Sequence, residues 1–288
     1  MKLFETLTRI DRRIIFLALG GLIIFSLLFP RFLKVRVFPP VTKLYEAIDK
    51  ITPDKALILD ISYGPQYQAE CEPMAYTVLR HAFKNRTKVL ALSLYAEYLG
   101  LAKKVLDDVI AEYNRNATSR ADSLIYGRDY VFLGWQPPPI IPILGMGESI
   151  AGVYQVDYYG NQTDTLPLMK HIKNYNNVDI LVALGGGTGS EKWWAQFAQR
   201  KFGLRVGAGC SAVLGADYYP YYQSGQFTGM MVGVKGAAEY EELASSRANI
   251  TAERVASERM LSLTYAHLIM IAFIVIGNIS YFVTRRKK

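Results

Sequence analysis

Cysteine and histidine are scarce in this sequence of 288 residues, which holds two cysteines and three histidines. So few cysteines exclude a disulfide-dense secreted scaffold, and the lack of a Cys-x-x-Cys pair excludes the common kind of structural zinc site. The sequence therefore predicts no metal and no cofactor. It leaves open whether Cys71 and Cys210 pair with each other.

Charged residues are also few, at 20% of the chain, although the formal net charge is +8. The termini carry most of that charge, because residues 1–13 have a net charge of +2 and residues 284–288 add +4. The long stretch between them is nearly neutral and lacks the basic stripe that a duplex-binding surface needs. We therefore expect no nucleic-acid partner.

Two long uncharged segments lie near the ends of the chain. Residues 14–29 (IIFLALGGLIIFSLLF) are flanked by arginines, and no small-residue cleavage motif follows, which favours an uncleaved signal anchor over a cleaved signal peptide. Residues 261–283 (LSLTYAHLIMIAFIVIGNISYFV) precede the basic C-terminus. We predict transmembrane helices over residues 14–30 and 261–283, with the lipid bilayer as a partner.

Two spans place both termini on the same side of the membrane. The basic tails, residues 1–13 and 284–288, favour the cytoplasm, which puts the intervening domain on the other side of the cell (inner or plasma) membrane. His267 and Asn278 are polar groups inside the second span, where a side chain of this kind prefers a partner. They indicate helix–helix contacts in a homo-oligomer or with other subunits of a membrane complex.

Between the anchors, residues 31–227 alternate short apolar runs with amphipathic stretches. Strands are expected at residues 56–63, 88–94, 130–133, 179–184 and 204–208, and helices at 68–83 and 96–113. This order predicts an α/β domain with three layers and a mostly parallel, Rossmann-like sheet. Residues 228–260 are largely compatible with helix, so we expect a helical stalk that leads to the second span.

In an open parallel sheet, ligands bind beyond the carboxyl ends of the strands. The loop at residues 185–190 (GGGTGS) follows one expected strand and precedes a helix, so its backbone amides suit an anion. It lacks the lysine of a P-loop and the G-x-G-x-x-G spacing, and Thr188 with Glu191 forms a capping-box pattern that also explains the turn. The candidate ligand-binding residues are Asp60, Ser62, Glu148, Gly186, Gly187, Thr188, Gly189, Ser190 and Ser211.

Tyrosines cluster around Pro220, and tyrosine provides rigid, amphipathic contact area. We predict that the cluster forms a subunit interface, with the alternative that it lines a pocket for a ring-shaped or glycan-like ligand together with Tyr154, Tyr158 and Tyr159. The interface candidates in this segment are Tyr218, Tyr219, Tyr221 and Tyr222.

No complete catalytic constellation is present in the sequence, so it does not identify an enzyme. The first hypothesis is a membrane-anchored α/β domain that acts as a non-enzymatic assembly or accessory subunit of an oligomeric membrane complex. The alternative is a membrane-tethered ligand-binding or hydrolytic domain with its pocket at the glycine-rich loop, residues 185–190.

Overall fold

The structure is a computed structural model that describes residues 11–28 and 35–285, and the chain divides into two compact units. The α/β unit comprises Val35–Glu253. The helical unit comprises the described residues of Met1–Lys34 and Arg254–Lys288. Each unit is described by itself below.

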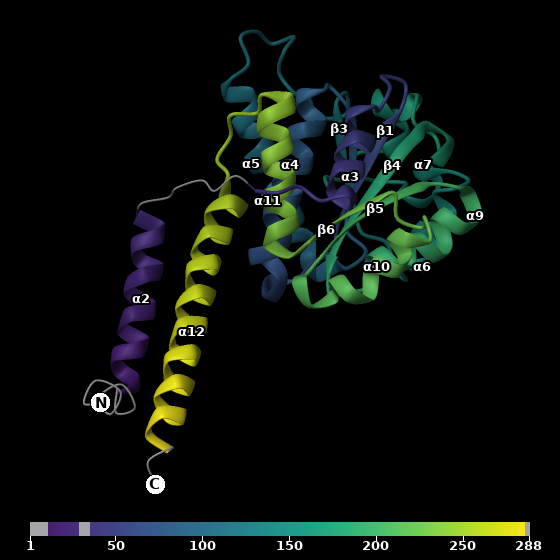
Figure 1. Cartoon of the computed structure of the whole chain (residues 1–288). Coiled ribbons are helices and arrows are strands. Elements are labelled where there is room, and N and C mark those ends of the chain that lie inside the picture. Colours follow the sequence, from purple (N-terminus) through teal and green to yellow (C-terminus); the bar gives the residue numbers. More distant parts are fainter. Residues whose placement is uncertain (1–10, 29–34, 286–288) are drawn as a thin grey trace. The chain divides into compact units, whose positions relative to one another are not determined.

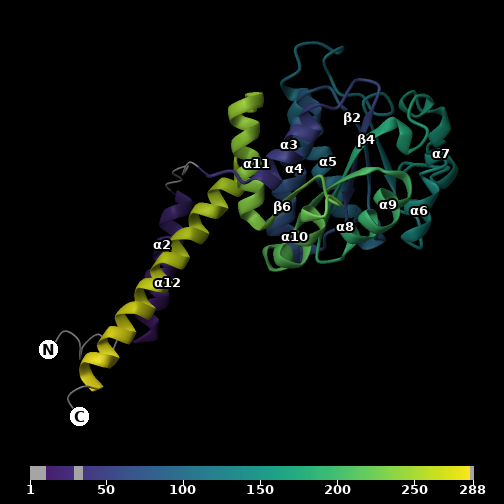
Figure 2. The same cartoon turned by 45° about the vertical axis from the view of Figure 1, so that its right-hand side comes forward.

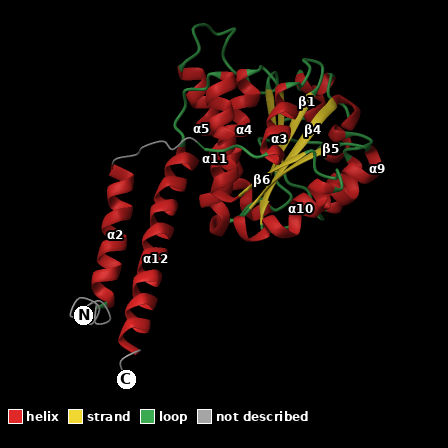
Figure 3. Ribbon diagram, viewed as in Figure 1, coloured by secondary structure: helices red, strands yellow, loops and turns green. Residues whose placement is uncertain are grey.

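The α/β unit is built on a sheet of six strands, all parallel, in the order β3-β2-β1-β4-β5-β6 (Figure 3). The strands are β1 (Ala56–Ile61), β2 (Lys88–Leu92), β3 (Tyr130–Gly134), β4 (Val178–Gly186), β5 (Arg205–Cys210) and β6 (Gly229–Val232). Every residue of β1 is buried, as expected of a central strand covered on both faces.

Helices cover both faces of this sheet, which makes three layers (Figures 1 and 2). One face carries α3 (Pro39–Asp49), α4 (Gln68–Lys84), α5 (Leu99–Arg115) and α11 (Gly233–Ala248). The other carries α6 (Ile140–Gly145), α7 (Ile150–Val153), α8 (Ser190–Trp193), the π-helical segment η6 (Trp194–Gln199), α9 (Arg200–Phe202) and α10 (Gly215–Gln223). The predicted α/β, three-layer fold is confirmed.

Short 3-10 turns connect these elements at both edges of the sheet. They are η1 (Pro65–Tyr67), η2 (Ala96–Tyr98), η3 (Thr163–Thr165), η4 (Leu168–Lys170), η5 (Tyr175–Asn177) and η7 (Ala212–Leu214). The turns η1, η2 and η7 follow the carboxyl ends of β1, β2 and β5, so they lie around the edge where ligands of such folds bind.

The helical stalk predicted for residues 228–260 is corrected by the structure. Its first residues form β6, which pairs with β5, so the sheet extends one strand further than expected. Its helix, α11, ends at Ala248, and the next residue, Asn249, has a φ of 51°, in the left-handed region that terminates helices. Residues 250–253 then run without helix to the helical unit, so no continuous stalk forms.

The helical unit contains α2 (Arg12–Leu28) and α12 (Val255–Arg285). Among the described residues, only α12 is both long and apolar enough to cross a membrane, while α2 is apolar but shorter. Of the two predicted spans, only the C-terminal one is therefore supported. Within this unit the two helices pack together, and the Ser26 hydroxyl donates to the Ser262 hydroxyl over 2.8 Å. Parts of the predicted segments, residues 1–10, 29–30 and 286–288, lie outside the described residues.

Candidate functional site

The strand order reverses between β1 and β4. The connection from β1 runs through α4 to β2 on one side, and the connection from β4 runs through α8 to β5 on the other. A crevice outside the carboxyl ends of the strands forms at such a switch point. The register pairs Ile61 with Leu184, so the residues after β1 lie beside the glycine-rich loop after β4.

Asp60 is a fully buried carboxyl group at this edge. The Ser62 hydroxyl donates to its Oδ1, and the indole Nε1 of Trp194 donates to its Oδ2 over 2.7 Å. Ser62 is itself held, because its Oγ accepts from the Leu94 amide at 2.9 Å. Burial raises the pKa of Asp60 to about 6, since the charged form loses its hydration.

Glu191 is a second fully buried carboxyl group, one residue into α8. Its Oε1 accepts from the Gly185 amide at 2.9 Å, and its Oε2 accepts from the Tyr218 hydroxyl at 3.2 Å. Burial raises the pKa of Glu191 to about 7, and the nearby charge of Asp60 raises it further. The edge therefore holds two interacting carboxyl groups that bind protons near neutral pH.

The conformation of the loop decides where Glu191 points. Gly189, with φ of 81°, is the N-cap of α8, so Thr188 does not occupy that position and the predicted capping box does not form. Instead the Glu191 side chain turns back beneath the loop to Gly185. The amides of Gly187 and Thr188 both donate to the Gly185 carbonyl, at 2.6 and 3.1 Å. The amides of Gly185, Gly187 and Thr188 are thus engaged within the chain and are not presented to a phosphate group.

Most of the predicted ligand-binding residues come together at this edge. Ser211 follows β5, and its amide donates to the Gly186 carbonyl at 3.2 Å. The members that share this edge are Asp60, Ser62, Gly186, Gly187, Thr188, Gly189, Ser190 and Ser211.

Glu148 does not join them. It is exposed, and its carbonyl lies 3.4 Å from the Asn174 side-chain amide, just before the start of β4. Its loop follows α6 rather than a strand, so the rule on carboxyl ends does not apply to it. The prediction of Glu148 as a neighbour of the glycine-rich loop is wrong.

The tyrosine cluster of α10 separates into inner and outer members. Tyr218 is buried and holds Glu191, so it does not belong to an exposed interface. Tyr219 is 46% exposed and Tyr221 and Tyr222 are half-buried, so these three remain candidates for contact. The interface itself stays a prediction.

The alternative pocket of tyrosines is divided as well. Tyr154 is buried near Asp60, whereas the Tyr158 amide donates to the Phe132 carbonyl at the outer side of the edge strand β3. The Tyr154 hydroxyl and the Ser211 hydroxyl are buried and have no hydrogen-bond partner within the described part of the chain. These two groups are available to a ligand or to water.

Sequence reasoning missed Glu191 and Trp194 as members of this site. Trp194 begins the π-helical segment η6, a rare geometry that often marks a functional position and that no residue pattern reveals. Neither histidine of the α/β unit reaches the site, because His81 is buried in the last turn of α4 and His171 follows η4. Cys71 and Cys210 are both free and buried, so they form no disulfide.

The fold and this edge define the chain as a doubly wound α/β protein with a buried acidic centre at its switch point. No family model, curated protein or solved structure matches the chain. Its function is therefore argued from the geometry alone.

Proposed function

We propose that this chain is a membrane-anchored binding protein whose α/β unit takes a small polar ligand at the carboxyl edge of β1 and β4. The observation that carries the proposal is the pair of buried carboxyl groups, Asp60 and Glu191, at the switch point of the sheet. Groups of this kind cost free energy to bury, and strongly raised pKa values in such a place are typical of functional sites.

The surrounding groups support a ligand that is rich in hydrogen-bond donors. The carboxyl groups accept hydrogen bonds from Ser62, Trp194, Gly185 and Tyr218, and no lysine or arginine is among the donors recorded for them. Lys192 lies 4.8 Å from the centroid of the Tyr218 ring but makes no ion pair with either acid, so an anion would meet two acids that have no cation paired with them. A neutral polyol or a primary amine suits them better than a phosphate, because the loop amides of Gly185, Gly187 and Thr188 are already engaged.

Thermal unfolding of the full chain in mild detergent tests this proposal. Neutral sugars, polyols and primary amines are added one at a time, with inorganic phosphate for comparison. At least one of the first three classes should raise the midpoint for the wild type and for Glu148→Gln, and this stabilisation should be lost in Glu191→Gln. A set of compounds that stabilises none of the proteins, or stabilises all three equally, would remove the support for a site at this edge.

A second candidate function, an assembly subunit of a membrane complex, is favoured by the faces of α12. His267 and Asn278 are eleven residues apart, about three helical turns, so they lie on one side of the helix. Both are exposed in the described chain, and Ser262, which contacts α2, lies about 140° around the helix from His267. A polar stripe that faces away from α2 suits a second transmembrane helix, from another copy or another subunit.

This second candidate includes a two-pass arrangement, in which α2 is a short span beside α12 and the α/β unit lies outside the cytoplasm. Cysteines introduced as Ser26→Cys and Ser262→Cys should form a disulfide, because the two hydroxyl oxygens are 2.8 Å apart. Protease added to intact cells should cleave the α/β unit if the topology is right.

His267→Leu with Asn278→Leu should reduce the native mass of the particle in mild detergent, and an unchanged mass would speak against assembly through this face.

A further inference from the structure

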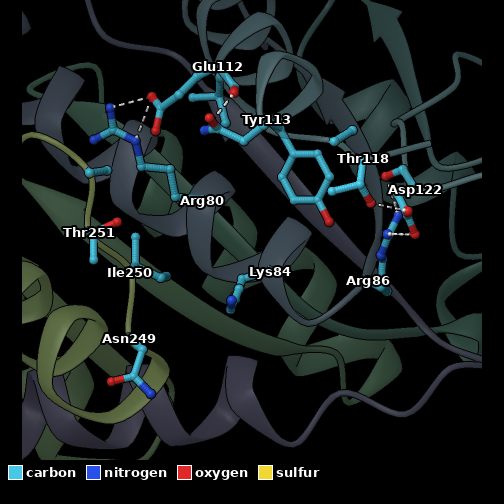
Figure 4. A pocket seen from close by; sticks show the side chains of 14 residues that line it. Arg80, Lys84, Arg86, Glu112, Tyr113, Thr118, Asp122, Asn249, Ile250 and Thr251 are labelled. Carbon is cyan, nitrogen blue, oxygen red and sulfur yellow. Dashed lines mark hydrogen bonds and ion pairs between the residues drawn. The ribbon is translucent and has the colours of Figure 1, made fainter. Parts of the chain in front are cut away.

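An open cavity of 350 Å³ lies at the opposite edge of the sheet, where α4 and α5 end (Figure 4). Its walls come from the last turns of both helices, from residues 116–118 and Asp122, and from residues 249–252 after α11. All of these residues belong to the α/β unit. The cavity is therefore separate from the acidic site after β1 and β4.

Two of the three basic side chains in the cavity are already paired. Arg80 donates to Glu112, with 2.6 Å between Nη2 and Oε2, and Arg86 donates to the Asp122 carbonyl at 2.7 Å. Lys84 has no ion pair or hydrogen bond with any described residue, and Figure 4 shows it apart from both pairs. The cavity thus has one cation more than it has acids.

Uncharged donors around Lys84 are also free. The Tyr113 hydroxyl, the Asn249 side-chain amide and the Thr251 hydroxyl line the cavity and make no hydrogen bond within the described chain. Tyr113 is held in place by the Arg86 guanidinium, which lies 5.4 Å from its ring centroid. The unused groups are mainly donors, so the missing partner is a group with several acceptor oxygens.

The C-terminal end of α4 does not cancel this preference for an anion. A helix C-terminus carries partial negative charge on its last carbonyl groups, which disfavours an anion. At the end of α4, however, the amides of Asn85, Arg86 and Thr87 donate to the carbonyls of His81, Phe83 and Ala82. Because backbone donors satisfy these carbonyls, the side chains dominate the charge in the cavity.

We propose that this cavity binds a phosphate-type anion, with Lys84 as its main cation and Tyr113, Asn249 and Thr251 as further donors. The anion is a soluble phosphate compound or the phosphate of a lipid headgroup. The wall at residues 249–252 is separated from Val255, the first residue of α12, by two residues only. Binding at Asn249 and Thr251 therefore fixes the segment that joins the α/β unit to the candidate span.

Isothermal titration of inorganic phosphate into the full chain in mild detergent tests the proposal, at constant ionic strength with chloride as the reference. Lys84→Met should weaken phosphate binding about tenfold or more, because a charge-assisted contact is lost. Lys50→Met is the matched control, since Lys50 is the C-cap of α3, lies outside the cavity and is 74% exposed, as Lys84 is an exposed lysine at the end of α4. It should bind phosphate as the wild type does.

A second arm uses native mass spectrometry of the same proteins with phosphatidic acid or phosphatidylcholine added. Retention of phosphatidic acid alone, with loss in Lys84→Met, would identify a lipid headgroup as the ligand. Binding of phosphate without phosphatidic acid would identify a soluble compound. The proposal is overturned if neither probe binds the wild type, or if Lys84→Met and Lys50→Met bind both probes equally well.

Discussion

The replacement of Glu191 by glutamine offers a direct test of the buried acidic centre. Glutamine has nearly the same shape, its carbonyl can accept from the Gly185 amide, and its NH2 group can donate to Tyr218. The variant therefore keeps the packing but cannot ionise. A difference in the pH dependence of unfolding between the two proteins reports the ionisation of Glu191 together with its coupling to Asp60.

The sign follows from the raised pKa of Glu191, which is about 7 in the folded chain against an ordinary value of 4.5 for glutamate. Between these values the unfolded chain has lost the proton while the folded chain keeps it, so the free energy of unfolding falls as pH rises. Below pH 4.5 both states are protonated and the penalty is absent. Above pH 7 the full penalty is present, about 3 kcal/mol from the size of the shift.

Urea unfolding of the full chain in mild detergent, followed by tryptophan fluorescence from pH 4.5 to 8, measures this penalty. All three tryptophans, Trp135, Trp193 and Trp194, lie in the α/β unit, so the signal reports that unit. At pH 5 the wild type and Glu191→Gln should differ little, and at pH 8 the variant should be more stable by about 3 kcal/mol. Glu148→Gln, at an exposed position, should follow the wild type throughout.

The shifted pKa of His81 does not disturb the comparison. Burial lowers the pKa of His81, which removes stability as pH falls below the usual range of histidine. That contribution is the same in both proteins and cancels in the difference. Parallel pH profiles for the wild type and Glu191→Gln would refute the claim that Glu191 takes up a proton in the folded state.

Four further substitutions test individual contacts by the same urea assay. Gly189→Ala should cost about 1 kcal/mol because its φ is 81° and the space around it is open, whereas Gly186→Ala should cost at least 1 kcal/mol more, since its added carbon would lie 2.6 Å from Tyr67. Trp194→Phe removes a donor to a buried carboxyl and should cost about 3 kcal/mol. Tyr240→Phe leaves the buried Nδ1 of His81 without its partner at 2.8 Å and should cost about 1 to 2 kcal/mol. A variant whose urea midpoint equals that of the wild type would contradict the contact that it tests.

The sheet was largely predictable because its strands are short apolar runs between amphipathic helices. The five expected strands all occur, with ends that differ by at most two residues. β6 escaped prediction because it has only four residues (GMMV) and α11 follows it without a turn sequence. Pairing with β5, which involves residues about 20 positions earlier in the chain, decides its conformation, and a local pattern does not contain that information.

The acidic site was predictable only in part, for a different reason. Chain order gives the edge at which Asp60, Ser62 and the glycine-rich loop meet, since all follow parallel strands. The role of Glu191 depends on a single backbone angle, the left-handed φ of Gly189, which turns the side chain inward instead of toward a cap. The same pattern of Thr188 and Glu191 fits both outcomes, so the residue types alone do not distinguish a capping glutamate from a buried acid.

The two sites differ in charge and lie at opposite edges of the sheet. Asp60 lies near the carboxyl end of β1, whereas Lys84 and Arg86 precede β2, and strands of six residues separate these edges by about 20 Å. Ligands at the two sites therefore do not compete for the same groups. Glu191→Gln alters only the carboxyl edge and Lys84→Met only the other. Glu191→Gln should therefore weaken the binding of a donor-rich ligand alone, and Lys84→Met should weaken the binding of phosphate alone. If each variant weakens the binding of both ligands, the two edges are coupled through the sheet, and a ligand at one edge changes the affinity at the other.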